Sequence, residues 1–377
     1  MKAGLITFHY AHHYGAQLQA YALMKSVSKA GADCEIIHYI RADTIEGSGL
    51  FKKGMSAGSL LSNANTLINY GKLKKRHDRF DSFVNHEMKL SERFYGSYEE
   101  LRREPPSYDV YVCGSDQIWN PLIYREQTFD PAFFAEFAAQ GKKIAYAPSF
   151  GITTIPEDKR EELKKYLAKF EALSVREKQG EKIIREISGR DAVTVLDPTL
   201  LLTGDEWSEL ASEPAYSQPY LLCYFITDGR KYSEYVKALS EQYHLPVVSL
   251  CGSRRVVPQT KHKVLDAGPE EFISLFRHAG LVCTDSFHGT VFSVNFKKDF
   301  YSFESAQKSE KSVNSRLYNI LDKLDLVSRL YSVSNGISEF KSKLSDKLGI
   351  IDYVAVDQLL QQERVFSCRY LKEALGV

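Results

Sequence analysis

Short apolar runs alternate with amphipathic segments along the first 200 residues. Leu5–Phe8 is one such run, and the polar turn His9–Gly15 separates it from a segment whose apolar positions recur at helical spacing as far as Gly31. Cys34–Tyr39 is apolar again, so the chain opens with the strand, loop, helix and strand typical of a parallel sheet covered by helices. The further strands predicted in this half are Tyr108–Cys113, Lys143–Ala147 and Ala172–Arg176, and the segment Val193–Thr199 closes the half.

The same alternation returns after residue 218. It predicts strands at 220–226, 246–250, 281–284 and 300–303, and helices at 231–243, 269–278, 290–296 and 314–324. We therefore predict an α/β fold with two Rossmann-like, doubly wound domains that face a cleft, residues 1–200 and 218–345. Residues 45–105, polar at first and then helical, are expected to be an insertion or a mobile flap of the first domain. Residues 350–377 are expected to form a C-terminal helix that packs back on the first domain.

The composition narrows the class of protein. The 49 basic and 48 acidic residues give a net charge of +1, which argues against a nucleic acid partner, because phosphate backbones require clustered positive charge. No apolar run approaches the roughly 20 residues of a membrane span. We therefore expect a cytoplasmic protein with at most peripheral contact at the inner face of the membrane. We interpret the basic run Lys72–His77 as a solvated helix face. The alternative is a surface that binds anionic lipid or a charged glycan.

The cysteines are scattered and form no CxxC pair. Thiols inside apolar runs behave as small hydrophobic groups, and we expect all six to be reduced. They are Cys34, Cys113, Cys223, Cys251, Cys283 and Cys368.

Polar side chains follow four of the predicted strands, at the edge where doubly wound sheets bind their ligands. In the first of these loops, His9, His13 and Tyr14 precede a helix whose N-terminal amides suit an anion. Adjacent histidines seldom bind one ion, and no ligand cluster has suitable spacing, so we predict no metal site. A GxGxxG dinucleotide fingerprint is absent from the sequence.

The second loop is Gly114–Pro121. A buried strand that breaks at Gly-Ser-Asp turns sharply and can present a hydroxyl and a carboxylate to substrate, although an N-cap is the competing interpretation for the serine. An indole at this place is expected to stack on a sugar ring. The predicted acceptor or cleft residues of this loop are Ser115, Asp116, Gln117, Trp119 and Asn120.

The third loop begins with Arg176 at the end of an apolar strand. A guanidinium group can donate two parallel hydrogen bonds to a phosphate or carboxylate, so the residue is a candidate to bind an anionic substrate. The competing interpretation is an ion pair with Glu177 or another neighbour.

The fourth loop is the turn Thr284–Thr290, between an apolar strand and a helix. His288 and Gly289 are expected at the start of that helix, beside backbone amides that lack helical partners. A histidine in this position can bind an anion or act as a general acid near neutral pH. Asp285, Ser286 and Thr290 complete the predicted polar corner.

Together these residues resemble the polysaccharide pyruvyl transferase family. The ordered segments that carry the resemblance are 4–9, 14–23, Gly114–Pro121, Tyr146–Gly151, Ser174–Glu177, Leu196–Thr199 and Thr284–Thr290. The resemblance implies a glycosyltransferase-B-like fold and transfer of a pyruvyl group from phosphoenolpyruvate to hydroxyls of a sugar. It also implies that His288 is the general acid and that Arg176 holds the donor, with Ser286, Gly289 and Thr290 beside it.

The chain departs from the family pattern at one position. The family usually has an arginine two residues before the histidine, where this sequence has Ser286. Arg316, Arg277 and Lys297 are the candidates to supply that cation instead.

The leading interpretation is therefore a transferase that forms a pyruvyl ketal on a polysaccharide or a lipid-linked glycan precursor. Phosphoenolpyruvate would be the donor substrate, and no cofactor is expected. Two alternatives remain: a nucleotide-sugar-dependent glycosyltransferase on the same scaffold, and a non-catalytic protein that binds a glycan or an anion.

Overall fold

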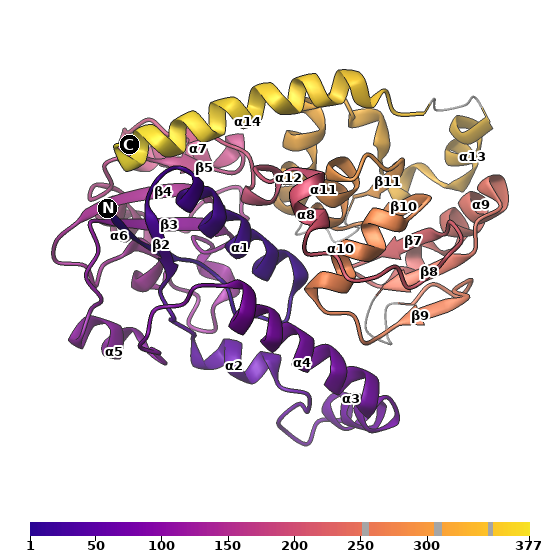
Figure 1. The fold of residues 1–377 in the computed structure, drawn as a ribbon, viewed down its shortest axis with the longest axis horizontal. Helices are drawn as coiled ribbons and strands as arrows, with labels where there is room; N and C mark the ends of the chain where they lie inside the picture. The colour runs from indigo at the N-terminus through magenta and orange to yellow at the C-terminus, as the bar shows by residue number, and fades with distance from the viewer. Residues whose placement is uncertain (251–255, 305–310, 346–349) are drawn as a thin grey trace. The chain divides into compact units, whose positions relative to one another are not determined.

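The computed structural model describes residues 1–250, 256–304, 311–345 and 350–377. Its contacts divide the chain into two compact units (Figure 1). Unit 1 comprises Met1–Lys52, Asp81–Leu202 and Gln361–Val377, and unit 2 comprises Lys53–Phe80 and Thr203–Leu360. The segment 45–105, expected as an insertion in the first domain, is thus divided between the units. Cys251 lies outside the described residues.

The sheet of unit 1 is parallel throughout and has the order β2-β1-β3-β4. Its strands are β1 (Lys2–Ile6), β2 (Asp33–Ile36), β3 (Val110–Asp116) and β4 (Lys142–Pro148). All but the last residue of β3 are buried, as expected for a parallel strand with both faces covered. Ala172–Arg176, predicted as one strand, contributes only the short β5 (Ser174–Val175), which pairs with β6 (Val193–Thr194).

Helix α1 (Tyr14–Lys29) packs on β2 and β3 of this sheet. A Cβ atom at Gly114 would overlap the side chain of Leu23, so the close approach of α1 to β3 requires glycine there. The other helices of unit 1 are α2 (Ala42–Ser48), α5 (Tyr98–Arg103), α6 (Arg160–Leu167), α7 (Lys178–Ser188) and the 3₁₀ turns η1 (Pro121–Ile123), η2 (Pro131–Phe134), η3 (Glu157–Lys159) and η4 (Pro198–Leu200).

The sheet of unit 2 is also parallel, with the order β12-β11-β10-β7-β8-β9. Its strands are β7 (Leu221–Tyr224), β8 (Val247–Leu250), β9 (His262–Val264), β10 (Leu281–Thr284), β11 (Phe300–Phe303) and β12 (Leu330–Tyr331). The sequence did not predict the two edge strands. β9 carries exposed polar side chains, as sheet edges often do, and β12 is too short to show an apolar pattern.

Helices fill the connections of unit 2. They are α3 (Ala57–Ile68), α8 (Gly204–Ser208), α9 (Ser233–Tyr243), α10 (Pro269–His278), α11 (Phe287–Asn295), α12 (Lys311–Lys323) and α13 (Ile337–Ser345), with the 3₁₀ turns η5 (Gly229–Tyr232), η6 (Val327–Arg329) and η7 (Val333–Asn335). Helix α4 (Tyr70–Glu87) begins in unit 2 and ends in unit 1.

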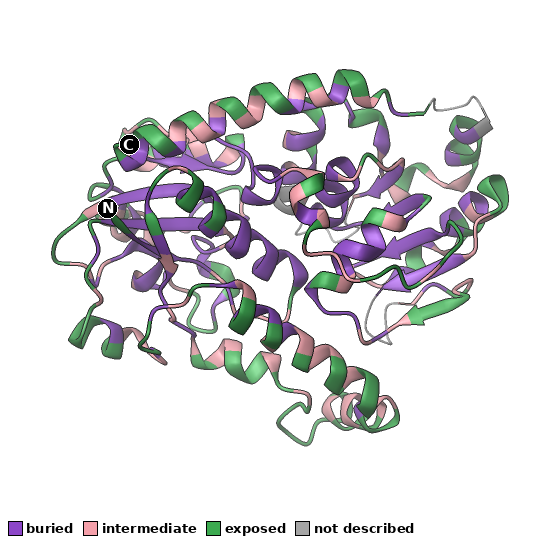
Figure 2. Cartoon of the chain, in the orientation of Figure 1, coloured by how far each residue is buried: buried purple, intermediate pink, exposed green. Residues whose placement is uncertain are grey.

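Figure 2 shows that the strands of both sheets are largely buried, so each unit has its own core. The predicted α/β fold with two Rossmann-like units is therefore confirmed.

The C-terminal helix α14 (Tyr353–Leu375) packs on unit 1 with its last turns, as predicted (Figure 1). The backbone N–H of Leu196 donates to Ser367 Oγ at 2.9 Å, and the Tyr370 hydroxyl donates to the Ala145 carbonyl at the same distance. Arg364 Nε donates to the Leu200 carbonyl at 2.6 Å. Over the described residues, no helix has both the length and the apolarity to cross a bilayer.

Candidate active site

Each sheet reverses its strand order at one point, and ligands of doubly wound folds bind beyond the carboxyl ends of the strands at such a point. In unit 1 the reversal lies between β1 and β3, which are followed by the loops containing His9 and Asp116. In unit 2 it lies between β7 and β10, where Tyr224 pairs with Thr284 just before the turn that contains His288. The topology therefore places three of the four predicted loops at the sites expected for ligands.

The turn after β10 is built by side chains that hydrogen-bond to the backbone. Ser286 is the N-cap of α11, and its Oγ accepts from the Gly289 N–H at 3.3 Å. Thr284 Oγ1 donates to the Tyr224 carbonyl at 2.5 Å and accepts from the Ser286 N–H at 3.0 Å. A Cβ atom at Gly289 would overlap the Thr284 side chain, so the first turn of α11 lies against the end of β10 only because residue 289 is glycine.

Asp285 and Thr290 hold this turn to its neighbours. Asp285 accepts from the backbone N–H groups of Ile226 and Thr227, at 2.6 and 3.0 Å, and from the Thr227 hydroxyl. Burial raises the pKa of Asp285, and these hydrogen bonds offset part of the rise. The Thr290 hydroxyl lies 2.6 Å from that of Ser302 on β11. Both side chains, expected near substrate, thus have local hydrogen bonds that fix the turn in place.

His288 lies in the first turn of α11, as predicted, and only 4% of its surface is exposed. Its ring lies nearly perpendicular to that of Phe287, with the ring centroids 5.2 Å apart. The guanidinium of Arg316, a buried residue of α12, lies 5.9 Å from the centre of the same Phe287 ring. Phe287 therefore has the histidine beside it and a cation over its ring.

The other two candidate cations lie elsewhere in unit 2. Lys297 follows the C-terminal end of α11, opposite His288, and pairs with Asp357. Arg277 is exposed in the last turn of α10. Arg316 is therefore the best placed of the three to replace the cation missing at Ser286.

In unit 1, the loop after β1 holds a buried polar cluster. Gln19 donates from Nε2 to Thr7 Oγ1 and to the Phe8 carbonyl, at 3.0 and 2.9 Å. His9 is buried, with Nδ1 3.2 Å from the Thr7 carbonyl, and its Nε2 has no hydrogen-bond partner among the described residues. Gln17 is fully buried, and neither atom of its amide has a partner within the same residues. Buried polar groups are normally satisfied, so each of these two side chains has hydrogen bonds that a ligand or water can supply.

His13 and Tyr14 contribute differently from what the sequence suggested. His13 is the N-cap of α1, and its Nδ1 accepts from the Ala16 N–H at 3.4 Å. Its side chain thus takes up one of the amides that an anion would need, which weakens the case for an anion site at this helix. Tyr14 is buried.

The loop after β3 has a strained start. Asp116 has φ 65, a left-handed conformation that is uncommon for residues other than glycine, and its Oδ1 accepts from the Gln117 N–H at 2.9 Å. Asn120 caps η1 through the Leu122 N–H and donates to Gln117 Oε1 at 2.8 Å. Ser115 is fully buried, and its hydroxyl lies 3.4 Å from Asp197 Oδ2.

Trp119 differs from its expected role. It is fully buried in the core of unit 1, stacked on Phe134 and in contact with Phe150 and Phe170. Its Nε1 donates to the Phe133 carbonyl at 3.1 Å. Because aromatic rings of the core cover the indole, it packs the sheet and is not available to stack on a sugar.

Arg176 is also buried, and carboxylates surround it. Its Nη1 lies 2.7 Å from Asp197 Oδ2, its Nη2 3.8 Å from Asp116 Oδ1, and its Nε 4.0 Å from Glu177 Oε2. Burial alone would lower the pKa of Arg176, but the neighbouring carboxylates, Asp197 first, raise it above its ordinary value. The ion pair with a neighbour, the competing interpretation of this residue, is therefore present, and an anionic ligand would also meet these carboxylates.

The burial of His9 has a measurable consequence. Burial lowers the pKa of His9 to about 4, against 6.5 for an exposed histidine, so folding favours the neutral ring. Below pH 6.5 His9 becomes protonated in the unfolded chain, whereas in the folded protein it stays neutral down to about pH 4. Replacement by glutamine is therefore expected to reduce the loss of unfolding free energy between pH 6.5 and 4 by up to about 3 kcal/mol.

Urea denaturation of the wild type and His9→Gln at several pH values measures this difference. His244→Asn, at an exposed histidine, is the control and should leave the pH dependence unchanged. Parallel curves for His9→Gln and the wild type would contradict the assignment of a neutral, buried His9.

Comparison with known proteins identifies the family of this chain. The family model described as polysaccharide pyruvyl transferase matches residues 13–307, most of the chain. The chain belongs to the polysaccharide pyruvyl transferase family. No curated protein matches the sequence.

Solved structures with similar folds are distant in sequence. A glycosyltransferase from Rickettsia africae ESF-5 is 11% identical with a TM-score of 0.53, over 100% of this chain and 97% of that one. A UDP-GlcNAc 2-epimerase from Methanocaldococcus jannaschii is also 11% identical, with a TM-score of 0.46 over 96% and 99% of the two chains. A glycosyltransferase of avilamycin A biosynthesis, AviGT4, is 12% identical with a TM-score of 0.49, over 100% and 99%. The likeness to the first supports the predicted glycosyltransferase-B-like fold.

Sequence reasoning did not select Asp197 or Gln17 as site residues. Asp197 stands in an Asp-Pro-Thr sequence, where an aspartate capping the following turn is expected, and its Oδ1 accepts from the Thr199 N–H at 3.0 Å. That signal predicts a cap but not the pairing with Arg176. Gln17 carries no signal, because a glutamine in a helix is usually exposed.

Proposed function

We propose that this protein transfers the pyruvyl group of phosphoenolpyruvate to two hydroxyls of a sugar, forming a ketal on a polysaccharide or a cell-surface glycan precursor. The observation that carries the proposal is the family match over residues 13–307. The acceptor would be free or lipid-linked, at the inner face of the membrane. Phosphoenolpyruvate is a substrate, and no cofactor enters the proposed reaction.

The donor is assigned to the turn after β10 in unit 2. The positive end of the α11 dipole favours the carboxylate or phosphate of the donor, with the Gly289 N–H already bonded to Ser286 Oγ. Arg316, over the ring of Phe287, supplies positive charge that Ser286 lacks. His288 is the catalytic residue, and Ser286, Gly289 and Thr290 form the turn that holds it.

The chemistry requires one proton to be delivered to carbon. His288 donates a proton to the methylene carbon of the enolpyruvyl group, which becomes a methyl group and leaves C2 electron-poor. One sugar hydroxyl then attacks C2 and loses its proton, which returns to the histidine. The second hydroxyl attacks the same carbon as the C2–O bond to phosphate breaks, and its proton leaves with the phosphate. The products are the cyclic ketal and inorganic phosphate.

The acceptor is assigned to the loops of unit 1. His9 Nε2 and the amide of Gln17 are buried polar groups whose hydrogen bonds a sugar hydroxyl could complete. Asp116 and its neighbours Gln117 and Asn120 provide further oxygens and an amide at the reversal of the sheet. We assign Arg176 a positioning role, because its pair with Asp197 orients the end of β3 through Ser115.

Incubation of the protein with phosphoenolpyruvate and a panel of glycans tests the proposal. The expected result is a release of inorganic phosphate that depends on both substrates. The glycan should gain the mass of pyruvic acid less one water, because the ketal replaces two hydroxyl hydrogens with the pyruvyl carbon. Phosphate release no faster than that without protein, for every acceptor, would count against the proposal.

A second function is favoured by the fold. The similarity to the Rickettsia africae glycosyltransferase makes a nucleotide-sugar donor the next candidate. Thermal-shift measurements with nucleoside diphosphates and with phosphoenolpyruvate separate the two, because only the true donor is expected to raise the melting temperature at low concentration.

The role of Arg316 can be tested directly. Arg316→Ala is expected to lower kcat/KM for phosphoenolpyruvate by about 10- to 100-fold, because a charge-assisted contact to the donor is lost. Arg316→Lys, which keeps the charge, should recover part of the loss, and Arg277→Ala should have no effect. Steady-state kinetics with the donor varied measures all three, and full activity of Arg316→Ala at low donor would contradict the assignment.

A further inference from the structure

Helix α3 of unit 2 has its apolar side chains on the outside. Its one buried residue is Thr66, and the half-buried positions are Ser59, Ser62, Asn63 and Asn65. The exposed positions include Leu60, Leu61, Leu67 and Ile68, which repeat at an interval of seven and therefore share one face. A surface helix of a globular protein normally has the opposite arrangement, with its apolar stripe against the core.

The exposure of these side chains is large. The exposed fractions are 56% for Leu60, 64% for Leu61, 65% for Leu67, 82% for Ile68 and 89% for Met55, which lies just before the helix. Single exposed apolar residues are ordinary, but a contiguous apolar face marks a surface that binds a partner or a membrane.

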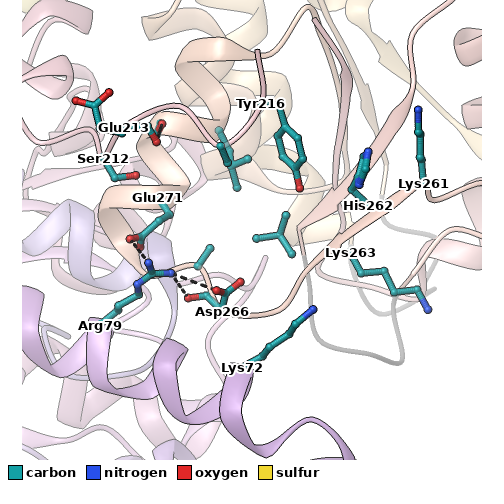
Figure 3. Close-up of a pocket in the computed structure, with 15 residues that line it drawn as sticks. Lys72, Arg79, Ser212, Glu213, Tyr216, Lys261, His262, Lys263, Asp266 and Glu271 are labelled. Carbon is teal, nitrogen blue, oxygen red and sulfur yellow. Dashed lines mark hydrogen bonds and ion pairs between the residues drawn. The ribbon is translucent and has the colours of Figure 1, made fainter. Parts of the chain in front are cut away.

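Positive charge adjoins this apolar face. Lys72 follows Ile68 by four residues on the next helix, α4, and lines a pocket of about 700 Å³ that lies within unit 2. Lys261, His262 and Lys263 of β9 line the same pocket, and Figure 3 shows Lys72 extending into it from below. Lys72, Lys261 and Lys263 have no ion pair with any other residue that the structure describes.

Two of the pocket's three acidic groups pair with a further cation, Arg79. Arg79 Nη2 lies 3.0 Å from Glu271 Oε1, and its Nη1 lies 3.6 Å from Asp266 Oδ2 and donates to the Asp266 carbonyl at 2.7 Å (Figure 3). Glu213 is the remaining acid of the lining. The lysines therefore leave the pocket with an excess of positive charge.

We propose that unit 2 docks on an anionic lipid bilayer, with the apolar face of α3 inserted at the interface and the lysine-lined pocket binding a lipid phosphate. An amphipathic helix with large apolar side chains, flanked by lysines, has the composition of an interfacial membrane anchor. Each lysine near a negatively charged bilayer adds an electrostatic attraction. Of the basic run Lys72–His77, which the sequence alone assigned to a solvated face, Lys72 is thereby part of the docking surface, whereas Lys74 and Lys75 pair with Asp78 and Asp266.

Charge decides against a second copy as the occupant. A second copy would cover the apolar face with its own, but it offers no negative surface to Lys72, Lys261 and Lys263 comparable to that of anionic head groups. A bilayer with negative head groups satisfies both the apolar face and the cations. This proposal does not depend on pyruvyl transfer, because membrane binding is measured without donor or acceptor.

Co-sedimentation of the full-length protein with vesicles tests the proposal. The protein is expected to sediment with vesicles of phosphatidylglycerol mixed into phosphatidylcholine, but not with phosphatidylcholine alone, and to be released by high salt. Leu61→Asn with Ile68→Asn should weaken binding by at least about tenfold, because two apolar side chains no longer enter the interface. Lys72→Gln with Lys263→Gln should weaken binding and reduce its dependence on salt.

Matched variants at exposed sites elsewhere in unit 2 are the controls. Val354→Asn removes an exposed apolar side chain on α14, and Lys237→Gln removes an exposed lysine on α9; both should bind as the wild type does. A wild type that stays in the supernatant with anionic vesicles would overturn the proposal. So would a wild-type dimer that Leu61→Asn with Ile68→Asn converts to a monomer, since the occupant would then be a second copy.

Free inorganic phosphate separates a lipid site from a soluble-anion site. If phosphate alone raises the melting temperature, the double lysine variant abolishes that rise, and vesicles do not bind, the pocket holds a soluble anion and the lipid assignment is wrong.

Discussion

Replacing His288 by alanine is expected to lower the rate of donor-dependent phosphate release by about 10²- to 10⁴-fold, the usual contribution of a general acid. The proposed reaction cannot proceed until the donor methylene is protonated, and His288 is the histidine in the first turn of α11, at the positive end of the helix dipole. The loss should appear in kcat more than in KM, because the proton moves in the transition state. Steady-state kinetics with an acceptor that supports wild-type turnover measures both constants.

Two controls keep this result specific. His244→Asn replaces an exposed histidine of the same unit and should leave the rate unchanged. His288→Gln preserves side-chain volume in a buried position, so a rate as low as that of His288→Ala at an unchanged melting temperature excludes a packing defect. A rate within about twofold of the wild type for both variants would rule out His288 as the acid.

Removal of Asp197 should have the largest effect on stability. Asp197→Ala leaves the buried Arg176 without its nearest carboxylate, and the loss of one partner of a buried ion pair costs about 3–5 kcal/mol of unfolding free energy. Asp197→Asn should cost less, because the amide oxygen can still accept from the Thr199 N–H that caps η4. Urea denaturation followed by the fluorescence of Trp119, in a Trp207→Phe background, reports on unit 1.

An exposed pair of the same type provides the comparison. Arg185 and Asp191 form an ion pair with side chains 73% and 80% exposed, so Asp191→Ala should cost less than about 1 kcal/mol. If Asp197→Ala were no more destabilising than Asp191→Ala, the buried pair would not be a structural contact of unit 1.

The arrangement of strands and helices was largely available from the sequence. Leu281–Thr284 and Phe300–Phe303 were predicted with their observed bounds, because buried parallel strands read as short apolar runs. In the segment 45–105 the sequence indicated helix after a polar start. It did not show that the segment is divided between the two units, or that α3 has its polar side turned inward. A pattern of period 3.6 gives the two faces of a helix but does not say which one meets the protein.

For the candidate site, too, some features followed from the sequence and others only from the folded structure. The position of His288 at the start of a helix followed from the strand before it and the glycine after it, and the structure has it there. From the sequence, Trp119 was expected to stack on a sugar ring. In the structure, three aromatic rings from other segments enclose it. Burial of this kind depends on residues distant along the chain, which no local pattern reports.

The sequence by itself determined the α/β class, the family and the loops that follow the strands, because these depend on local periodicity and on the order of short motifs. Only the tertiary structure decided which charges meet. It paired Arg176 with Asp197, 21 residues away, and put Arg316 over Phe287 next to His288. The physical reason is that electrostatic partners are chosen by distance in space, and the strand order that sets those distances is a property of the folded chain.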